Sequence, residues 1–334
     1  MDRVAILGAG AWGTALAIHL ARGRDAPSVR LWTRDPRGAA ELIAARQNAR
    51  YLPGIAIPSS VAIAANLNVA VADASLIVLA TPVSALLQVA SAARQSAAAP
   101  LFWLGKGFVA MSVKPGVALA HQVVGPSWPA PVGVISGPSF AEEVARARPT
   151  AVTVAASDRG VAEQVAQRLR SETFRAYVSD DLIGVEVAGA VKNVLAIAAG
   201  ASDGLAFGHN ARAALITRGL AETGRLSAAL GGKRETLMGL AGLGDLVLTC
   251  TGDLSRNRRV GLALAQGRRL AAILAELGHV AEGVAAARDV RALCDDMHVD
   301  MPICDAVYRV LYEDVPPRRA VEALLAREPG PEFD

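Results

Sequence analysis

Short apolar runs alternate with longer mixed segments over the first 180 residues of the chain. The runs are four to seven residues long, as buried strands are, and the segments between them have helical periodicity. The runs predicted as strands are Arg3–Leu7, Val29–Trp32, Ser75–Ala80, Leu101–Leu104, Val132–Ser136, Thr150–Ala156 and Phe174–Val178. Apolar strands that alternate with helices predict a mostly parallel sheet, covered by helices on both faces.

The pattern changes after residue 180, where helical periodicity continues nearly to the end of the chain without a convincing strand. A length of 334 residues is long for one hydrophobic core and sufficient for two. We therefore predict two domains, a sheet-containing domain over residues 1–180 and an all-helical domain over residues 181–334.

A glycine-rich turn separates the first predicted strand from the first predicted helix. Its glycines, Gly8, Gly10 and Gly13, have the spacing GxGxxG, with Ala11 and Trp12 between the last two. In this context the first two glycines allow a tight turn and close approach of a pyrophosphate, and the third allows the helix to pack on the strand. The helix N-terminus then faces the anion. The predicted fold class is therefore α/β, with an N-terminal doubly wound sheet of the Rossmann type followed by an all-α domain.

The residues after the second predicted strand bear on which dinucleotide binds. Sites that prefer NADH usually have an acidic residue there for the ribose hydroxyls, whereas an arginine accommodates the 2′-phosphate of NADPH. Arg34 occupies this place, and Asp35, which precedes Pro36, is better explained as the N-cap of the next helix. The sequence therefore favours NADPH over NADH without excluding NADH.

The helix predicted over Gly184–Gly200 carries a lysine within an otherwise apolar run of small residues. At helical spacing, Lys192 and Asn193 share a face with four small or apolar residues: Val185, Ala188, Gly189 and Ala196. A charge in such a setting is costly unless it is paired or has a function. Only four of the 34 basic residues are lysines, so the chain uses arginine almost wherever a positive charge suffices. A lysine retained here indicates an ammonium group that must release its proton, which arginine cannot do.

Lys192 is therefore a candidate active-site residue. Lys106, which lies between Gly105 and Gly107 after the fourth predicted strand, is a second candidate. The alternative for Lys192 is a structural lysine that is exposed or is paired with a carboxylate such as Glu186.

A second group of polar residues predicts a phosphate site. Ser255 is expected to cap a helix that ends near Gln266, which places Arg256 and Asn257 at a helix N-terminus. Such an end, together with an arginine, suits a phosphate group. Arg256 could instead be a solvated surface charge, and Asp245 upstream could be a helix cap.

Composition excludes several classes of protein. The net charge is only +3 and the basic residues are scattered, so no electrostatic case for nucleic acid follows. No uninterrupted apolar run approaches the ~18 residues of a membrane span.

The apolar N-terminus could be a signal peptide, but its glycine spacing favours a nucleotide loop. Three cysteines without metal-ligand or CxxC spacing indicate free thiols in a reducing compartment, and we expect a cytoplasmic protein without a membrane partner.

Eight motifs, in order along nearly the whole chain, resemble those of bacterial NAD(P)-dependent sn-glycerol-3-phosphate dehydrogenases. They are Gly8–Ala17, Tyr51–Gly54, Gly105–Gly107, Ser136–Ala141, Glu186–Asn193, Gly242–Asp245, Ser255–Asn257 and Val280–Gly283. The resemblance implies a Rossmann domain followed by a helical substrate domain. It also implies reversible reduction of dihydroxyacetone phosphate to sn-glycerol 3-phosphate, a precursor of glycerophospholipids.

The resemblance further implies roles for individual residues. Lys192 would donate and accept the proton at the C2 oxygen of the substrate, assisted by Lys106 and Asp245. The residues that would contact the small-molecule substrate are Lys106, Gly137, Ser139, Lys192, Asp245, Thr249, Ser255, Arg256 and Asn257. The residues that would contact NADPH or NADH are Gly8, Gly10, Ala11, Trp12, Gly13, Arg34, Lys106, Ala141, Arg256, Val280 and Glu282. No metal is expected, and a homodimer is a candidate assembly that the sequence does not decide.

Two other hypotheses stay open. A β-hydroxyacid dehydrogenase or a ketopantoate reductase would share the glycine loop and the lysine-bearing helix, but the phosphate site at Ser255–Asn257 argues against it. A non-enzymatic dinucleotide sensor would need the glycine loop but not Lys106, Lys192 and Asp245 together.

Overall fold

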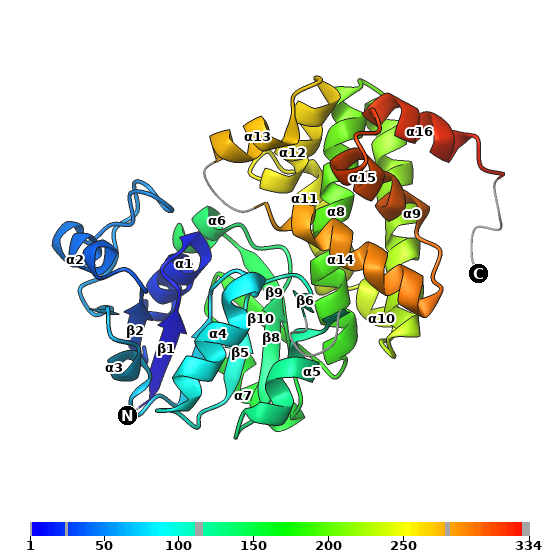
Figure 1. Cartoon of the computed structure of the whole chain (residues 1–334). Coiled ribbons are helices and arrows are strands. Elements are labelled where there is room, and N and C mark those ends of the chain that lie inside the picture. The colour runs from blue at the N-terminus through cyan, green and yellow to red at the C-terminus, as the bar shows by residue number, and fades with distance from the viewer. Residues whose placement is uncertain (1, 24–25, 111–115, 278–280, 329–334) are drawn as a thin grey trace. The chain divides into compact units, whose positions relative to one another are not determined.

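The computed structural model describes residues 2–23, 26–110, 116–277 and 281–328 (Figure 1). The chain forms two compact units, Met1–Gly105 with Ala120–Leu182, and Lys106–Leu119 with Ile183–Asp334. The predicted boundary after residue 180 did not assign residues 106–119 to the second unit. The described residues Phe108 and Leu119 of this segment are buried in the hydrophobic core of the second unit.

An eight-stranded sheet forms the centre of the first unit. Its strands, in spatial order, are β10 (Phe174–Ser179), β9 (Thr150–Ala156), β8 (Val132–Ser136), β5 (Leu101–Trp103), β4 (Leu76–Leu79), β1 (Arg3–Leu7), β2 (Ser28–Trp32) and β3 (Ala62–Ala64). Neighbouring strands are parallel except β8 and β9, which are antiparallel. The seven predicted strands and the mostly parallel sheet are confirmed, and the order from β3 to β8 is that of a doubly wound dinucleotide-binding sheet.

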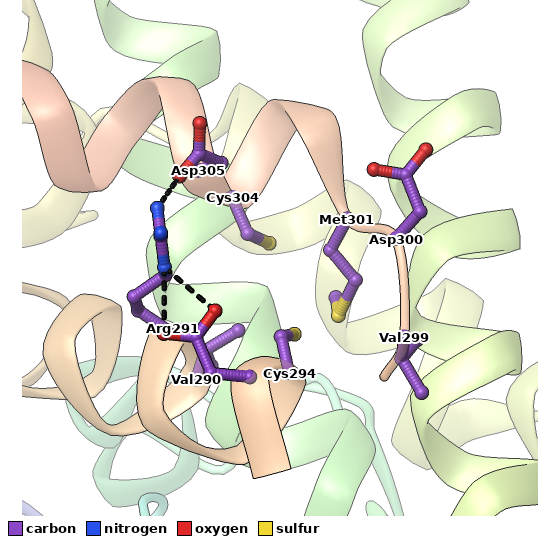
Figure 2. A pocket seen from close by; sticks show the side chains of 9 residues that line it. Val290, Arg291, Cys294, Val299, Asp300, Met301, Cys304 and Asp305 are labelled. Carbon is purple, nitrogen blue, oxygen red and sulfur yellow. Dashed lines mark hydrogen bonds and ion pairs between the residues drawn. The ribbon is translucent and has the colours of Figure 1, made fainter. Parts of the chain in front are cut away.

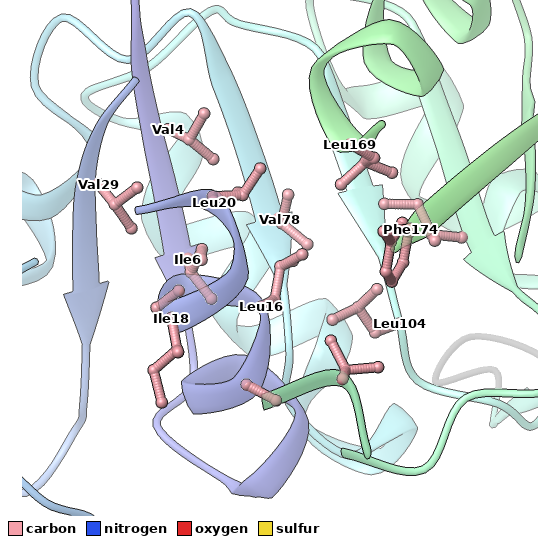
Figure 3. Packing of buried hydrophobic residues seen from close by; sticks show 14 of the residues in the cluster. Val4, Ile6, Leu16, Ile18, Leu20, Val29, Val78, Leu104, Leu169 and Phe174 are labelled. Atoms are coloured by element: carbon pink, nitrogen blue, oxygen red, sulfur yellow. The ribbon is translucent and has the colours of Figure 1, made fainter. Parts of the chain in front are cut away.

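Helices cover both faces of this sheet. One face is covered by α1 (Ala11–Leu20), α6 (Ala141–Ala145) and α7 (Arg159–Leu169). The helices that contact the sheet from its other side are α3 (Leu67–Val71), α4 (Val83–Arg94) and α5 (Ala120–Val124). On β1, Val4 and Ile6 pack against α1 (Figure 3). Ala5 and Leu7, which alternate with them along the strand, are equally buried. Burial on both faces explains why the central strands β1, β4, β5 and β8 are nearly continuous apolar runs, whereas the edge strand β10 alternates buried residues with the exposed Arg175 and Tyr177.

The second unit is helical from Ile183 onward. Its helices are α8 (Leu182–Gly204), α9 (Gly208–Ala229), α10 (Arg234–Leu237), α11 (Asp245–Thr251), α12 (Arg256–Ala265), α13 (Leu270–Leu277), α14 (Glu282–Met297), α15 (Pro302–Tyr312) and α16 (Pro317–Leu325). An antiparallel ribbon of β6 (Val109–Ala110) and β7 (Val117–Ala118) adds to them. The predicted all-helical C-terminal domain is confirmed for its described residues, because the ribbon lies outside residues 181–334. The two strands of the ribbon have two residues each and are too short to produce a recognisable periodicity in the sequence.

The lysine-bearing helix α8 is the core helix of the second unit. Among the described residues, α8 is the one unbroken helix that is long and apolar enough to cross a membrane. However, 89 % of its most apolar 18-residue window is buried inside the protein. Its small residues allow other backbones to approach. A Cβ atom at Gly200 would lie 2.0 Å from the Arg258 carbonyl oxygen on α12, which no side chain tolerates.

Two predicted helix starts are confirmed. Asp35 Oδ1 accepts a hydrogen bond from the Arg37 backbone N–H at 3.0 Å, where α2 (Pro36–Ala45) begins. Ser255 Oγ accepts from the Arg258 N–H at 3.2 Å, where α12 begins. Both caps are local in sequence, so the residue types near each helix start were sufficient to predict them.

A third helix start is capped by a distant residue. The buried carboxylate of Glu222 on α9 accepts hydrogen bonds from the backbone N–H groups of Ile303 (2.8 Å) and Cys304 (3.3 Å), in the first turn of α15. Burial raises the pKa of Glu222 to about 7, although these two hydrogen bonds act in the opposite direction.

Candidate active site

Three charged side chains meet inside the second unit. Lys192 Nζ lies 2.5 Å from Asp245 Oδ1, and Lys106 Nζ lies 2.5 Å from Asp245 Oδ2. Thr249 Oγ1 accepts a hydrogen bond from Lys192 Nζ at 2.9 Å and donates to the Asp245 carbonyl oxygen at 2.6 Å. One carboxylate therefore bridges two ammonium groups, and the carboxylate paired with Lys192 is Asp245 rather than Glu186.

A π-helical turn positions Asp245. It spans Leu240–Gly244, and Asp245 is the first residue of α11. A Cβ atom at Gly242 would lie 2.1 Å from the Leu237 carbonyl oxygen, so this wide turn is packed too tightly for a side chain there. The Asp245 carboxylate binds two lysines, so the helix-cap interpretation of this residue is wrong. Apart from its glycines, the sequence carries no signal for the π turn.

Burial sets the charge states in this cluster. Lys192 is 8 % exposed and Asp245 is 1 % exposed. Burial lowers the pKa of Lys192 to about 8, Asp245 opposes that effect, and the charge on Lys106 adds to it. Burial by itself would raise the pKa of Asp245, but the two lysines outweigh it and lower that pKa overall. Lys192 is therefore an ammonium at neutral pH that releases its proton in the mildly alkaline range, as a general acid–base group requires.

The start of α12 has the properties of an anion site. Because Ser255 caps the Arg258 N–H, the backbone N–H groups of Arg256 and Asn257 in the first turn point out of the helix end. Arg256 is exposed, and its guanidinium donates no hydrogen bond to any described residue. A helix N-terminus with an available guanidinium suits a phosphate group.

Arg258 and Arg259, which follow in the sequence, already have hydrogen-bond acceptors within the protein. Arg258 donates to Asp203 at 2.8 Å and to Asp253 at 3.1 Å. Arg259 donates to the Asp253 carbonyl oxygen at 3.0 Å. Of the arginines Arg256, Arg258 and Arg259, Arg256 is therefore the one whose guanidinium makes no hydrogen bond to a described residue.

A chain of amides joins three helices around the lysines. Asn257 Nδ2 donates to Asn193 Oδ1 at 2.9 Å, and Asn257 Oδ1 accepts from the Gly283 N–H at 3.0 Å. Asn193 Nδ2 lies 3.4 Å from the Lys106 carbonyl oxygen. Asn257, predicted to contact phosphate, thus has a structural role here, although one amide hydrogen remains for a ligand. The structural role of Asn193 was missed, and its only sequence signal is that it shares a helix face with Lys192.

The Glu282 carboxyl lies close enough to Arg256 and to the two lysines of the cluster to interact with them electrostatically. Burial raises the pKa of this carboxyl, and the charges of Arg256, Lys106 and Lys192 oppose the increase. Glu282 begins α14, next to Gly283 of the amide chain. Val280, also predicted to contact the cofactor, lies outside the described residues.

The glycine loop of the first unit fits a dinucleotide. Gly8 has φ +125°, and a Cβ atom there would lie 2.7 Å from the Ala80 carbonyl oxygen; one at Gly13 would lie 1.9 Å from the Gly8 carbonyl oxygen. Gly10 differs, because its φ of −75° is open to any residue and its Cβ would meet no described atom within 4 Å. Within the described chain no side chain caps α1, which begins at Ala11. Open space before an uncapped helix start is what a pyrophosphate requires.

Two predicted loops of the first unit are in contact. The Trp12 indole N–H donates to the Ser139 carbonyl oxygen at 2.8 Å, and Ser139 Oγ donates to the Gly137 carbonyl oxygen at 2.9 Å. Ala141 begins α6, which packs against α1. The glycine loop and the loop after β8 are therefore neighbours, joined by the hydrogen bond from Trp12 to Ser139.

Arg34, which follows β2, is exposed and makes no hydrogen bond in the described ranges.

A cavity of about 250 Å³ lies elsewhere in the second unit, between α14 and α15 (Figure 2). Its lining residues are Val290, Arg291, Cys294, Asp295, Val299, Asp300, Met301, Cys304 and Asp305. Arg291 is already paired with Asp295 and Asp305. All three cysteines of the chain are free, and burial raises the pKa of Cys294 to about 12, so this thiol is unreactive. The cavity contains none of the predicted site residues that the structure describes.

Family models match both parts of the chain. The model of the NAD-dependent glycerol-3-phosphate dehydrogenase N-terminus matches residues 3–162, and that of the C-terminus matches residues 181–322. The chain belongs to the NAD-dependent glycerol-3-phosphate dehydrogenase family. The predicted family, enzyme class, fold class and NAD(P) dependence of this dehydrogenase are thereby confirmed.

Individual relatives agree with the family models. The dehydrogenase is 53 % identical to a glycerol-3-phosphate dehydrogenase (NAD(P)+) of Aromatoleum aromaticum, covering 98 % of this chain and 99 % of the relative. It is 52 % identical to the one from Thiobacillus denitrificans, covering 99 % of this chain and 100 % of the relative. The crystal structure of glycerol-3-phosphate dehydrogenase from Coxiella burnetii superposes with a TM-score of 0.92 at 44 % identity, covering 98 % of this chain and 99 % of that one.

A ketopantoate reductase shares only the fold. The structure of that enzyme from Ralstonia eutropha matches the dehydrogenase with a TM-score of 0.55 at 16 % identity, covering 96 % of this chain and 99 % of that one. The alternative of a related two-domain reductase is therefore far less similar in both sequence and structure than the glycerol-3-phosphate dehydrogenases.

Proposed function

We propose that this protein catalyses the reversible reduction of dihydroxyacetone phosphate to sn-glycerol 3-phosphate with NADH or NADPH. The observation that carries the proposal is the buried cluster in which Asp245 bridges Lys192 and Lys106. Such a cluster suits a reaction that places negative charge and then a proton on a carbonyl oxygen. The names of the relatives supply the substrate, and Arg256 at the start of α12 supplies a site for its phosphate.

The chain's own groups carry the proton. When bound, the nicotinamide supplies the hydride that reduces C2 of the ketone. Lys192 donates a proton to the C2 oxygen as that oxygen gains negative charge, and in the oxidative direction it accepts the proton of the C2 hydroxyl. Asp245 keeps Lys192 charged at neutral pH, and Lys106 contributes a second positive charge. The low exposure of the cluster strengthens these electrostatic effects.

We assign the remaining predicted residues to binding. The residues that would hold the dinucleotide are Gly8, Gly10, Ala11, Trp12, Gly13, Arg34, Lys106, Ala141, Arg256 and Glu282. Those that would hold the substrate, besides the three charged residues of the cluster, are Gly137, Ser139, Thr249, Ser255, Arg256 and Asn257. Because Asp35 is used as a helix cap and Arg34 is exposed, we propose that the site prefers NADPH to NADH.

The proposed place of the enzyme in the cell follows from its product. Glycerol 3-phosphate is the backbone of glycerophospholipids, so the enzyme would supply lipid synthesis from the cytoplasm.

The test is the loss of reduced nicotinamide absorbance after dihydroxyacetone phosphate is added to the purified protein. We expect turnover with NADPH and with NADH, and little turnover when unphosphorylated dihydroxyacetone replaces the phosphate ester. Absence of turnover with both cofactors, or faster turnover with ketopantoate, would contradict the proposal.

A further inference from the structure

The motif Tyr51–Gly54 has no role in the mechanism above, but the segment around it brings a side chain to the glycine loop. Asn48 lies just before the motif and is only 4 % exposed. Its carbonyl oxygen accepts a hydrogen bond from the Leu52 N–H at 2.8 Å, and Leu52 is buried in the core of the first unit. The turn is therefore anchored by its leucine and holds Asn48 in place.

Every hydrogen-bonding group of the Asn48 amide is used. Nδ2 donates to the Ala9 carbonyl oxygen at 2.9 Å and to Thr14 Oγ1 at 2.7 Å. Oδ1 accepts from the Tyr51 N–H at 3.2 Å. Exchanging the amide oxygen and nitrogen would place an oxygen against the Ala9 carbonyl, so the orientation of the side chain is fixed. Asn48 thus connects the turn both to the glycine loop and to the first helix.

The bond to Ala9 controls the direction of a neighbouring donor. The Ala9 carbonyl and the Gly10 N–H belong to one peptide group, and the described chain has no cis peptide bonds. In a trans peptide these two groups point in opposite directions. With the carbonyl turned towards Asn48, the Gly10 N–H points away from it, and it donates to no described acceptor. The adjoining N–H groups of Ala11 and Trp12, in the first turn of α1, also lack intrahelical acceptors.

We propose that Asn48 is a positioning residue that orients the Ala9–Gly10 peptide and thereby presents the Gly10 N–H to the dinucleotide pyrophosphate. Asn48 itself does not contact the cofactor. The proposal rests on the dinucleotide cradle of the proposed function, but it does not depend on which ketone the enzyme reduces.

The test is the dissociation constant of each dinucleotide, measured by fluorescence titration of the purified full-length Asn48→Ala and Asn48→Asp variants. A hydrogen bond to a charged group corresponds to roughly a tenfold or larger change in Kd. We expect Asn48→Ala to weaken NADH, NADPH and ADP-ribose by the same factor, of about ten or more, because all three contain the pyrophosphate. Asn48→Asp should weaken them further, since a carboxylate oxygen would then face the Ala9 carbonyl.

Two comparisons separate this role from a loss of stability. Adenosine 2′-monophosphate lacks the pyrophosphate, so its competition constant should stay unchanged in Asn48→Ala. Asn66 Oδ1 accepts from the backbone N–H groups of Asn68 and Val69 at the start of α3, so Asn66→Ala removes asparagine–backbone hydrogen bonds of the same unit that do not involve the glycine loop. Asn66→Ala should keep the wild-type Kd for all ligands. If Asn48→Ala does not fold, Asn48→Ser keeps one donor and should show a smaller loss with the same ligand pattern.

Folded Asn48 variants that bind NADH and ADP-ribose with the wild-type Kd would overturn the proposal. An equal loss for adenosine 2′-monophosphate, or an equal loss in Asn66→Ala, would overturn it as well. If the wild-type protein binds dinucleotides but does not reduce dihydroxyacetone phosphate, the proposed substrate is wrong, and the titrations still decide the role of Asn48.

Discussion

Asp245→Asn removes the negative charge that the buried Lys192 and the partly buried Lys106 share. Asparagine has nearly the same size and shape, so the packing around the cluster is kept while the charge is lost. The pKa of Lys192 is about 8 because burial lowers it, Asp245 opposes the decrease and Lys106 adds to it. Without the carboxylate, both remaining effects act in the same direction, and the pKa of Lys192 must fall further.

The size of the shift follows from the short contact. Asp245 Oδ1 lies 2.5 Å from Lys192 Nζ, and an opposite charge within ~4–6 Å changes a pKa by about 1–3 units. Oxidation of glycerol 3-phosphate requires the neutral amine, so the rising limb of kcat against pH should move about 1–3 units below the wild-type midpoint. Reduction requires the ammonium form, so its rate at neutral pH should fall.

The assay is the initial rate in both directions at saturating substrate, from about pH 5 to about pH 10. Asp203→Asn is a matched control, because Asp203 is a partly buried carboxylate of the same unit that is shared by Arg212 and Arg258. It should leave the midpoint of the oxidative limb unchanged. If folded Asp245→Asn also keeps the wild-type midpoint, Asp245 does not set the charge of Lys192, and the electrostatic explanation of the cluster is wrong.

Three further substitutions test other parts of the protein. Arg34→Ala should raise KM for NADPH by about tenfold or more and leave KM for NADH unchanged, whereas equal losses would show that Arg34 does not bind the 2′-phosphate. Arg256→Ala should raise KM for dihydroxyacetone phosphate by about tenfold or more, with Arg259→Ala as the unaffected control; a proportionate loss with unphosphorylated dihydroxyacetone would argue against phosphate binding. Because burial raises the pKa of Glu222 from 4.5 to about 7, the folded protein holds this proton more tightly, and the free energy of unfolding should fall by up to ~3 kcal/mol as the pH rises through that window. Glu222→Gln should remove this pH dependence in denaturant titrations, and an unchanged slope would contradict the assignment.

Local patterns account for most of what the sequence predicted. The central strands of the first unit are nearly continuous apolar runs because both of their faces are buried, and such runs can be recognised directly in the sequence. The caps by Asp35 and Ser255, and the glycine spacing before α1, are likewise set by residues within a few positions of each other.

Long-range contacts account for what the residue patterns could not predict. Lys106 and Asp245 are 139 residues apart in the chain, and only the folded second unit brings them together. The residues alone marked both lysines as candidates, but the role of Asp245 came from the family resemblance, because its position depends on a π turn. The amide chain through Asn193 and the contact of Asn48 with the glycine loop join segments that are distant in the sequence. Neither therefore produces a hydrophobic periodicity or a residue spacing that could be recognised in the sequence.

Lys192→Arg tests most directly whether Lys192 transfers a proton or only supplies charge. Arginine keeps the positive charge but does not release its proton, and its larger planar head must fit a buried site beside Asp245 and Thr249. General acid–base catalysis typically contributes ~10²–10⁴-fold, so kcat should fall by about that factor or more while melting temperature and dinucleotide Kd stay near wild type. Lys233→Arg, the same change at an exposed lysine, should have wild-type kcat. A Lys192→Arg enzyme with wild-type kcat would contradict proton transfer by Lys192.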